Sequence, residues 1–139
     1  MSKVFTIGYG GRSPAEFVQM LADSGVKTIV DVRLRPDRAA MGAFAKAKSP
    51  DKGIERLLGD AGVGYRSFIE LGNVFLDFDD WQDRYARLLA QASDLLMERL
   101  LEVPPPFCLM CAEKKVSECH RRHIADSLLK RGWKVTHLE

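Results

Sequence analysis

The sequence predicts a single α/β domain of three layers, a mainly parallel sheet of about five strands flanked by helices. Apolar runs of strand length alternate with amphipathic segments of helical period along the chain. The runs are apolar nearly throughout, as in parallel strands that are covered on both faces. The length of 139 residues suits one domain, and neither a repeat nor a linker divides the chain. We therefore assign residues 1–139 to one domain.

The first part of the chain contains the clearest strand–helix–strand unit. A strand over residues 3–9 runs into the glycine-rich turn at 8–12. Ser13 and Pro14 predict a helix start, because serine caps helices and proline suits the first helical position. The apolar run at 28–32 predicts a second, buried strand.

The rest of the chain continues this alternation. We expect, in order, a short helix over 49–58, a strand within 62–66, a long helix from Asp79 or Asp80 to Leu100, a strand over Phe107–Cys111, a helix from Ser117 or Glu118 to Arg131, and a final strand over 133–138. The aromatic residues Phe78, Trp81 and Tyr85 are expected in the core around the long helix.

Composition excludes several classes of protein. Hydrophobic residues make up 46% and charged residues 29%, which excludes disordered and low-complexity chains. A net charge of +2 gives no strong field for nucleic acid, so such a partner stays open without support from charge. No stretch approaches the ~20 apolar residues of a membrane span, and the start resembles no signal peptide. We expect a cytoplasmic protein without a membrane partner; its oligomeric state stays open.

Three groups of polar residues follow predicted strands. They are residues 9–12, 31–33 and 111–113. Ligands of parallel sheets bind at the carboxyl ends of the strands. These groups are therefore expected to converge at one rim.

The strongest chemical signal is a cysteine that leaves a buried strand, a polar loop, and a second cysteine at a helix start. The loop begins at Cys111, and Cys119, His120 and Arg121 are expected in the first helical turn. Helix N-termini bind anions and favour thiolates, and a neighbouring histidine or arginine adds to this effect. The pattern predicts a reactive thiolate, an anion cradle, or both.

Cysteines also have simpler explanations. Three are too few for a disulfide framework, so all are expected as thiols, with Cys108 as a buried apolar residue. Cys119 and His123 share a helical face, but the chain lacks the paired spacing of structural zinc sites. Cys108 and Cys111 should point to opposite faces of their strand. We expect no metal and no cofactor.

A second signal is the pair Asp31 and Arg33 at the end of a strand. The carboxylate could act as a base or orient a histidine, and the guanidinium could hold a carboxylate or phosphate. A self-contained ion pair is the structural alternative. Residues 33–48 are basic, which favours a solvated loop over a nucleic-acid contact. The glycines near Arg12 lack the lysine of a phosphate-binding P-loop.

Taken together, these motifs resemble the prokaryotic domain-of-unknown-function 488 family over essentially the whole chain. The resemblance rests on residues 6–13 (TIGYGGRS), 30–33 (VDVR), 70–73 (ELGN), 109–114 (LMCAEK) and 118–121 (ECHR). It implies a compact intracellular α/β domain and supplies no reaction. The recurring polar positions of the family fall on Tyr9, Gly10, Arg12, Asp31, Arg33, Glu70, Gly72, Cys111, Glu113, Cys119, His120 and Arg121.

The architecture is also similar, more distantly, to rhodanese-like domains and low-molecular-weight phosphatases. There too a strand ends in a cysteine whose loop wraps an anion. The phosphatase spacing of cysteine, five residues and arginine is missing, because position 117 is serine. This argues against phosphoester chemistry at Cys111 and leaves sulfur transfer or another thiol reaction open.

The first functional hypothesis is an enzyme for a small phosphate- or sulfur-bearing anion. Cys111 or Cys119 would be the nucleophile, His120 the proton carrier, and Asp31 an orienting residue. The candidate substrate-binding residues are Tyr9, Gly10, Arg12, Arg33, Glu70, Glu113 and Arg121. The alternatives are a non-catalytic module for nucleotide or nucleic-acid phosphates, and a protein-partner module with a structural ion-pair pocket. The sequence also leaves open whether Cys111 and Cys119 lie within disulfide reach.

Overall fold

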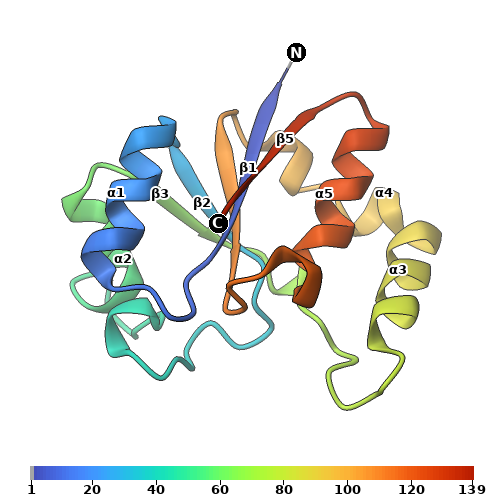
Figure 1. Cartoon of the computed structure of the whole chain (residues 1–139), viewed down its shortest axis with the longest axis horizontal. Helices are drawn as coiled ribbons and strands as arrows, with labels where there is room; N and C mark the ends of the chain where they lie inside the picture. The colour runs from blue at the N-terminus through green and yellow to red at the C-terminus, as the bar shows by residue number, and fades with distance from the viewer. Residues whose placement is uncertain (1) are drawn as a thin grey trace.

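Five parallel strands form one sheet with the spatial order β3-β2-β4-β1-β5. The computed structural model describes residues 2–139 (Figure 1). The strands are β1 (Lys3–Gly8), β2 (Thr28–Asp31), β3 (Gly64–Ser67), β4 (Phe107–Cys111) and β5 (Lys134–Leu138). The predicted strands and the parallel sheet are thus confirmed.

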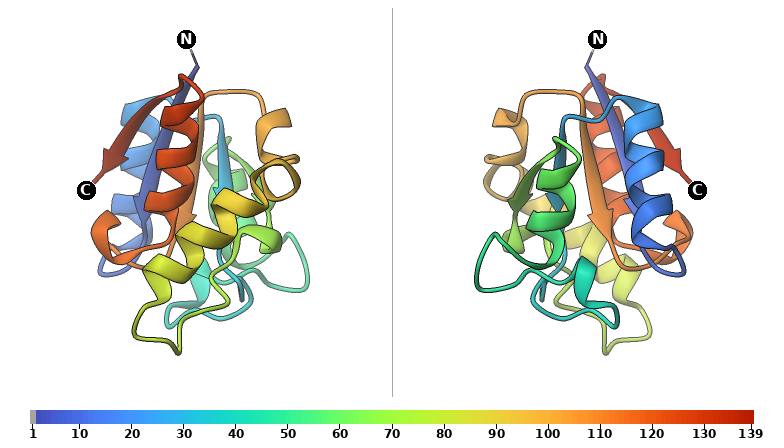
Figure 2. Two further views of the ribbon diagram at one scale, coloured as in Figure 1. Left: turned by 90° about the vertical axis from the view of Figure 1, so that its right-hand side faces the viewer. Right: turned by 90° about the vertical axis from the view of Figure 1, so that its left-hand side faces the viewer.

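Helices cover both faces of the sheet, so the predicted three layers are confirmed (Figure 2). One face carries α1 (Pro14–Ser24) and α2 (Gly53–Asp60), and the other carries α3 (Trp81–Gln91), α4 (Ser93–Leu96) and α5 (Arg121–Lys130). Four short 3-10 helices complete the fold: η1 (Gly42–Phe44), η2 (Ile69–Leu71), η3 (Leu100–Glu102) and η4 (Val116–Glu118).

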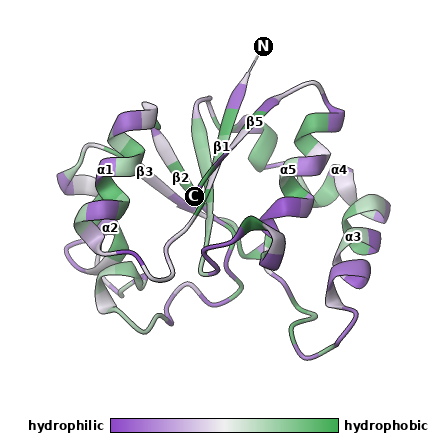
Figure 3. Ribbon diagram, viewed as in Figure 1, coloured by the Kyte–Doolittle hydropathy of each residue, from purple (hydrophilic) through white to green (hydrophobic). Residues whose placement is uncertain are grey.

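The core lies in two apolar layers, one on each face of the sheet. Phe17 and Leu21 of α1 and Leu58 of α2 pack on one face, together with Cys108 of β4. Cys111 belongs to the opposite layer, with residues of α3 and α5. All five residues of β4 are buried, which explains why its sequence is apolar throughout. Figure 3 shows that the central strands β4 and β2 are largely hydrophobic, whereas the helices on either side carry both hydrophobic and hydrophilic residues.

The start of α1 has the predicted cap. Ser13 Oγ accepts a hydrogen bond of 3.1 Å from the backbone N–H of Glu16, and Pro14 is the first helical residue. Gly25 ends the helix at a φ of 71°, a left-handed conformation that glycine adopts without strain. These local signals placed the first helix correctly.

The prediction of one long helix that reaches Leu100 is wrong, because this segment is divided into α3, α4 and the 3-10 helix η3. The backbone of Ala92 leaves the helical region at φ −119° and ψ 25°, between α3 and α4. This break lets Met97 and Leu100 turn into the core, while Leu95 of the predicted apolar stripe is exposed. Phe78 is also exposed, against the expectation that it packs in the core.

Two other helices begin later than predicted. The short helix starts at Gly53, because residues 46 and 53 first form an isolated bridge and Lys52 is extended. The last helix starts at Arg121, after the separate 3-10 helix η4. Cys119 has an extended backbone, and His120 is the N-cap. The two residues therefore precede the first turn that was expected to contain them.

The topology places a crevice at the carboxyl ends of β1, β2 and β4. The chain leaves β1 and β2 toward the face of α1 and α2, and it leaves β4 toward α5 on the opposite face. The loops after these strands are joined by backbone hydrogen bonds. Tyr9 N donates to Cys111 O over 3.1 Å, Gly10 N to Ala112 O over 2.8 Å, and Val32 N to Met110 O over 3.1 Å. The predicted convergence at one rim is confirmed.

Within residues 2–139, no helix has both the length and the apolar character that a membrane crossing requires.

Candidate functional site

A pocket of about 210 Å³ lies at this rim, and we call it the rim pocket. The ends of β1, β2 and β4 each contribute to its lining. The lining residues are Tyr9, Arg33, Leu34, Arg35, Arg38, Asn73, Leu76, Cys111, Ala112, Glu113 and His120. Apolar walls and arginines therefore surround a cysteine and a histidine.

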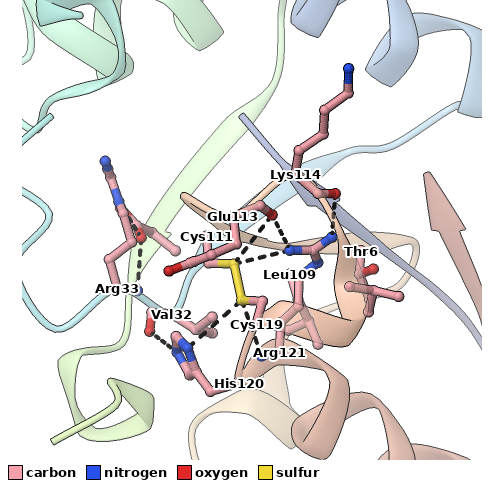
Figure 4. Close-up of a disulfide and its surroundings, with 12 residues drawn as sticks. Thr6, Val32, Arg33, Leu109, Cys111, Glu113, Lys114, Cys119, His120 and Arg121 are labelled. Atoms are coloured by element: carbon pink, nitrogen blue, oxygen red, sulfur yellow. Dashed lines mark hydrogen bonds and ion pairs between the residues drawn. A yellow bond between two sulfur atoms is a disulfide. The ribbon is translucent and has the colours of Figure 1, made fainter. Parts of the chain in front are cut away.

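The sulfur atoms of Cys111 and Cys119 are joined in a disulfide bond (Figure 4). The expectation of three thiols is therefore wrong for this pair. The loop after β4 folds back over η4 and brings the extended Cys119 against the strand end. Cys108 is free and fully buried, as predicted, and burial raises the pKa of its thiol.

Arg121 is the largest fully buried side chain of the fold and holds this loop in place. Its Nη1 donates to the carbonyl of Glu113 over 2.6 Å and to Cys111 Sγ over 3.0 Å, and its Nη2 donates to the carbonyl of Lys114 over 3.2 Å. Within residues 2–139 no carboxylate lies at ion-pair distance from the guanidinium, and its Nε has no partner. Burial lowers the pKa of Arg121, yet a guanidinium stays protonated in proteins.

His120 connects Cys119 to the end of β2. Its Nε2 lies 2.7 Å from the carbonyl oxygen of Val32, which can only accept a hydrogen bond. Nε2 therefore carries the proton, and Nδ1 presents its lone pair toward Cys119 Sγ at 3.7 Å. Burial lowers the pKa of His120 to about 4, and the nearby charge of Arg121 contributes. The ring, which packs edge-on against Tyr85, is thus neutral at neutral pH.

Asp31 and Arg33 form a buried, two-pronged ion pair. Arg33 Nε and Nη2 donate to the two carboxylate oxygens over 2.9 and 2.6 Å, and the hydroxyl of Tyr65 donates to the same carboxylate. Arg33 Nη1 reaches Tyr9 Oη at 3.3 Å and the carbonyl of Phe44 at 2.8 Å. Burial alone would lower the pKa of Arg33, but its contacts with Asp31 outweigh burial and raise it. Most donors of this arginine are therefore already engaged.

Glycines at the end of β1 and just beyond it allow close backbone contact with the loop that follows β4. A side chain at Gly8 would place its Cβ 1.7 Å from the carbonyl oxygen of Glu113, and one at Gly10 would approach Ala112 O to 2.5 Å. Arg12 is buried beside them, and its Nε donates to the carbonyl of Gly8 over 2.8 Å. The glycine-rich motif thus serves close backbone packing at the rim.

The structure separates the predicted site residues into four groups. Five of them line the rim pocket: Tyr9, Arg33, Cys111, Glu113 and His120. Three lie behind that lining and contact it: Asp31, Cys119 and Arg121. Gly10 and Arg12 border a neighbouring hollow of about 440 Å³. Glu70 does not line the rim pocket and instead pairs with Arg99 on the surface over 2.7 Å.

Sequence reasoning did not select Arg35, Arg38, Asn73 and two leucines of the lining. The basic composition of residues 33–48 is the sequence signal for the two arginines, although by itself it favours a solvated loop. Both arginines are exposed, and neither has an acidic partner within the described chain. The amide Nδ2 of Asn73 has no hydrogen-bond partner, although the side chain is almost completely buried.

Three possible metal ligands lie together at the disulfide. Ligand atoms of Cys111, Glu113 and Cys119 lie within 4.8 Å of one another. Metals bind thiolates, and neither sulfur is a thiolate while the two are bonded. After reduction, the guanidinium of Arg121 beside Cys111 would oppose a cation there. His123, which was expected to share a helical face with Cys119, is bound to Gln82, with 2.9 Å between Nε2 and Oε1.

Comparison with known proteins agrees with the resemblance in the motifs. The family model described as "Domain of unknown function DUF488" matches residues 13–128. No curated protein and no solved structure matched the chain, so the similarity to rhodanese-like domains stays an expectation. Since the family model covers well over half of the sequence, the chain belongs to the DUF488 family.

Proposed function

We propose that the protein is a thiol enzyme that holds a small phosphate- or sulfur-bearing anion in the rim pocket. The sulfur of Cys111, once reduced, is the attacking atom. The observation that carries this proposal is the buried guanidinium of Arg121, whose Nη1 lies 3.0 Å from Cys111 Sγ with no carboxylate at ion-pair distance in residues 2–139. A thiolate at Cys111 supplies the missing negative charge.

The energetic argument compares two states of the reduced protein. With a neutral thiol, the charge of Arg121 stays buried without a counter-ion, which costs several kcal/mol. A thiolate at 3.0 Å gains about 5 kcal/mol of attraction at an effective dielectric constant of ~20. This gain is similar to the cost of burying the thiolate. The pair therefore favours the nucleophilic form of Cys111 over the thiol.

The anion is expected to contact donors that have no other partner. Most donors of Arg33 are engaged by Asp31, by Tyr9 and by the carbonyl of Phe44. The arginines of the lining that lack an acidic partner in the described chain are Arg35 and Arg38. Asn73 Oδ1 accepts from the backbone N–H of Phe75 over 2.9 Å, which fixes the amide and leaves Nδ2 as a free donor. These groups support binding of a phosphate, sulfate or carboxylate beside Cys111.

The test measures iodoacetamide labelling of the reduced protein from pH 5 to pH 9, with each cysteine assigned by mass spectrometry. Cys111 is expected to label rapidly near pH 6, well below the ordinary thiol pKa of ~8.5. Phosphate or sulfate should slow this labelling. Cys108 is the internal control, because it lies in the apolar layer on the opposite face of the sheet and does not line the rim pocket.

Two variants make the test specific. Arg121→Met removes the guanidinium and should move the labelling of Cys111 to alkaline pH. Arg122→Met removes an exposed arginine of the same helix and should leave the labelling unchanged. Ordinary alkaline labelling of Cys111 in the unaltered protein would contradict the thiol enzyme. If anions still bound in that case, the non-catalytic phosphate-binding alternative would be favoured.

A further inference from the structure

The two sulfur atoms of the disulfide have different surroundings. Cys111 lines the rim pocket, whereas Cys119 lies behind the lining. Cys111 Sγ faces the guanidinium of Arg121, while Cys119 Sγ accepts the backbone N–H of Arg121 over 3.4 Å and faces His120 Nδ1 at 3.7 Å. A substrate in the pocket therefore meets Cys111 first.

His120 can serve Cys119 as a hydrogen-bond acceptor. The carbonyl of Val32 fixes the proton on Nε2, so Nδ1 is the acceptor that faces the sulfur. In the reduced protein, the S–H of Cys119 can donate to Nδ1. The ring is neutral at neutral pH because burial lowers its pKa to about 4. His120 is thus a positioning residue that directs the lone pair of Cys119 toward Cys111.

We propose that Cys111 and Cys119 together reduce a small anionic substrate that contains a sulfur–sulfur bond. The proposal rests on the thiol function proposed above and names its substrate class. A phosphoryl transfer needs one thiol and no electrons, so it gives no role to a second cysteine. A bonded sulfur pair is the oxidised product of a two-electron reaction, and the structure contains that product.

The reaction has two exchange steps. The Cys111 thiolate attacks one sulfur of the substrate, the substrate bond breaks, and its electron pair leaves on the other sulfur as a first thiolate. Cys119, whose S–H donates to His120 Nδ1, attacks Cys111 Sγ, and its proton passes to the second thiolate as that thiolate leaves. The substrate gains two electrons, and the Cys111–Cys119 bond forms. An external dithiol returns the pair to its reduced form.

The residues that line the pocket narrow the class of possible substrates further. Arg35 and Arg38 offer positive charge, whereas Leu34, Leu76 and the ring of Tyr9 offer apolar contact. This combination fits a disulfide whose substituents join an anionic group to an apolar or aromatic body. The aromatic dicarboxylate 5,5′-dithiobis(2-nitrobenzoate) is a probe of this class, and the neutral 4,4′-dithiodipyridine is its uncharged counterpart.

The test counts the thiolates that the reduced protein releases from the anionic probe. The unaltered chain should release two nitrothiobenzoate ions in a rapid phase, keep no adduct and end with the Cys111–Cys119 bond. Cys119→Ser should release one and retain the other on Cys111, as seen by mass. Cys111→Ser should lose the rapid phase. Circular dichroism of each variant checks that it is folded.

The rates of reaction with the anionic and the neutral probe give a second test. The double variant Arg35→Ala and Arg38→Ala should react about fivefold more slowly with the anionic probe and at an unchanged rate with the neutral one. Arg56→Ala, on the exposed side of α2, is the matched control and should change neither rate.

Two outcomes would overturn the inference. The unaltered protein could keep the mixed adduct on Cys111, as Cys119→Ser does, or Cys111→Ser could keep the rapid phase. If Cys111 still labelled rapidly with iodoacetamide at pH 6, only the exchange reaction would be wrong. Slow labelling of Cys111 would instead contradict the proposed thiol function itself.

Discussion

Replacing Asp31 with asparagine tests the buried ion pair that supports the rim. The Asp31 carboxylate is fully buried and accepts from Arg33 and Tyr65. Asparagine keeps the size of the side chain but removes its charge, so the guanidinium of Arg33 stays buried without a counter-ion. Breaking a buried pair in this way costs about 3–5 kcal/mol of unfolding free energy. For a chain of this length, that loss corresponds to a fall in Tm of roughly 10–20 °C.

The assay is urea unfolding followed by circular dichroism at pH 7, with the disulfide kept oxidised in every variant. Asp60→Asn is the matched control, since its ion pair with Arg56 is exposed and is expected to contribute less than about 1 kcal/mol. The double variant Asp31→Asn with Arg33→Met removes the unpaired cation as well. It should recover part of the loss, because both charges are then absent.

The reasoning would be refuted if Asp31→Asn lost no more stability than Asp60→Asn at an unchanged urea dependence. In that case water or other groups would already compensate the charge of Arg33, and the pair would not stiffen the rim.

Two further predictions concern the same rim. The folded pKa of His120 is about 4 and the unfolded value is near 6.5, so the unfolded chain binds the proton first and stability falls as pH drops between these values. Between pH 7 and pH 4, the free energy of unfolding of His120→Gln should fall by about 3 kcal/mol less than that of the unaltered protein. An equal fall in both proteins would contradict a buried, neutral ring. Gly8→Ala should lower the free energy of unfolding, measured with urea, by about 1–3 kcal/mol or more, because the new Cβ would collide with the backbone of Glu113. At Gly59 nothing lies within 4 Å of a new Cβ, so Gly59→Ala should raise the free energy of unfolding by about 0.5–1 kcal/mol. Equal effects at both glycines would exclude a tight contact at the rim.

Local signals in the sequence predicted most of the architecture. The cap at Ser13 and the apolar period of the strands depend on neighbouring residues only, so they can be read directly. The break at Ala92 could not be predicted in this way, because no glycine or proline lies near it in the sequence. It arises because Met97 and Leu100 must reach the core, which is a demand of the tertiary fold.

The site was predictable to the extent that topology determines it. Parallel strands bring their carboxyl ends to one edge, so the meeting of Tyr9, Arg33 and Cys111 followed from the order of elements. The bond between Cys111 and Cys119 depends on the path of the loop between them, which the buried side chain of Arg121 determines. No periodicity reveals that a charged residue will lie inside and hold a loop.

The strand order also determines when this site can form during folding. β1 lies between β4 and β5, and Val4 pairs with Phe107 and Val135, far along the chain. During synthesis the first strand has no neighbour to pair with until β4 has emerged, about 100 residues later. Contacts of such long sequence separation slow folding, because the loop between them must close first. Assembly of the rim is thus a late folding event. A ligand that binds there stabilises only chains that have completed their fold.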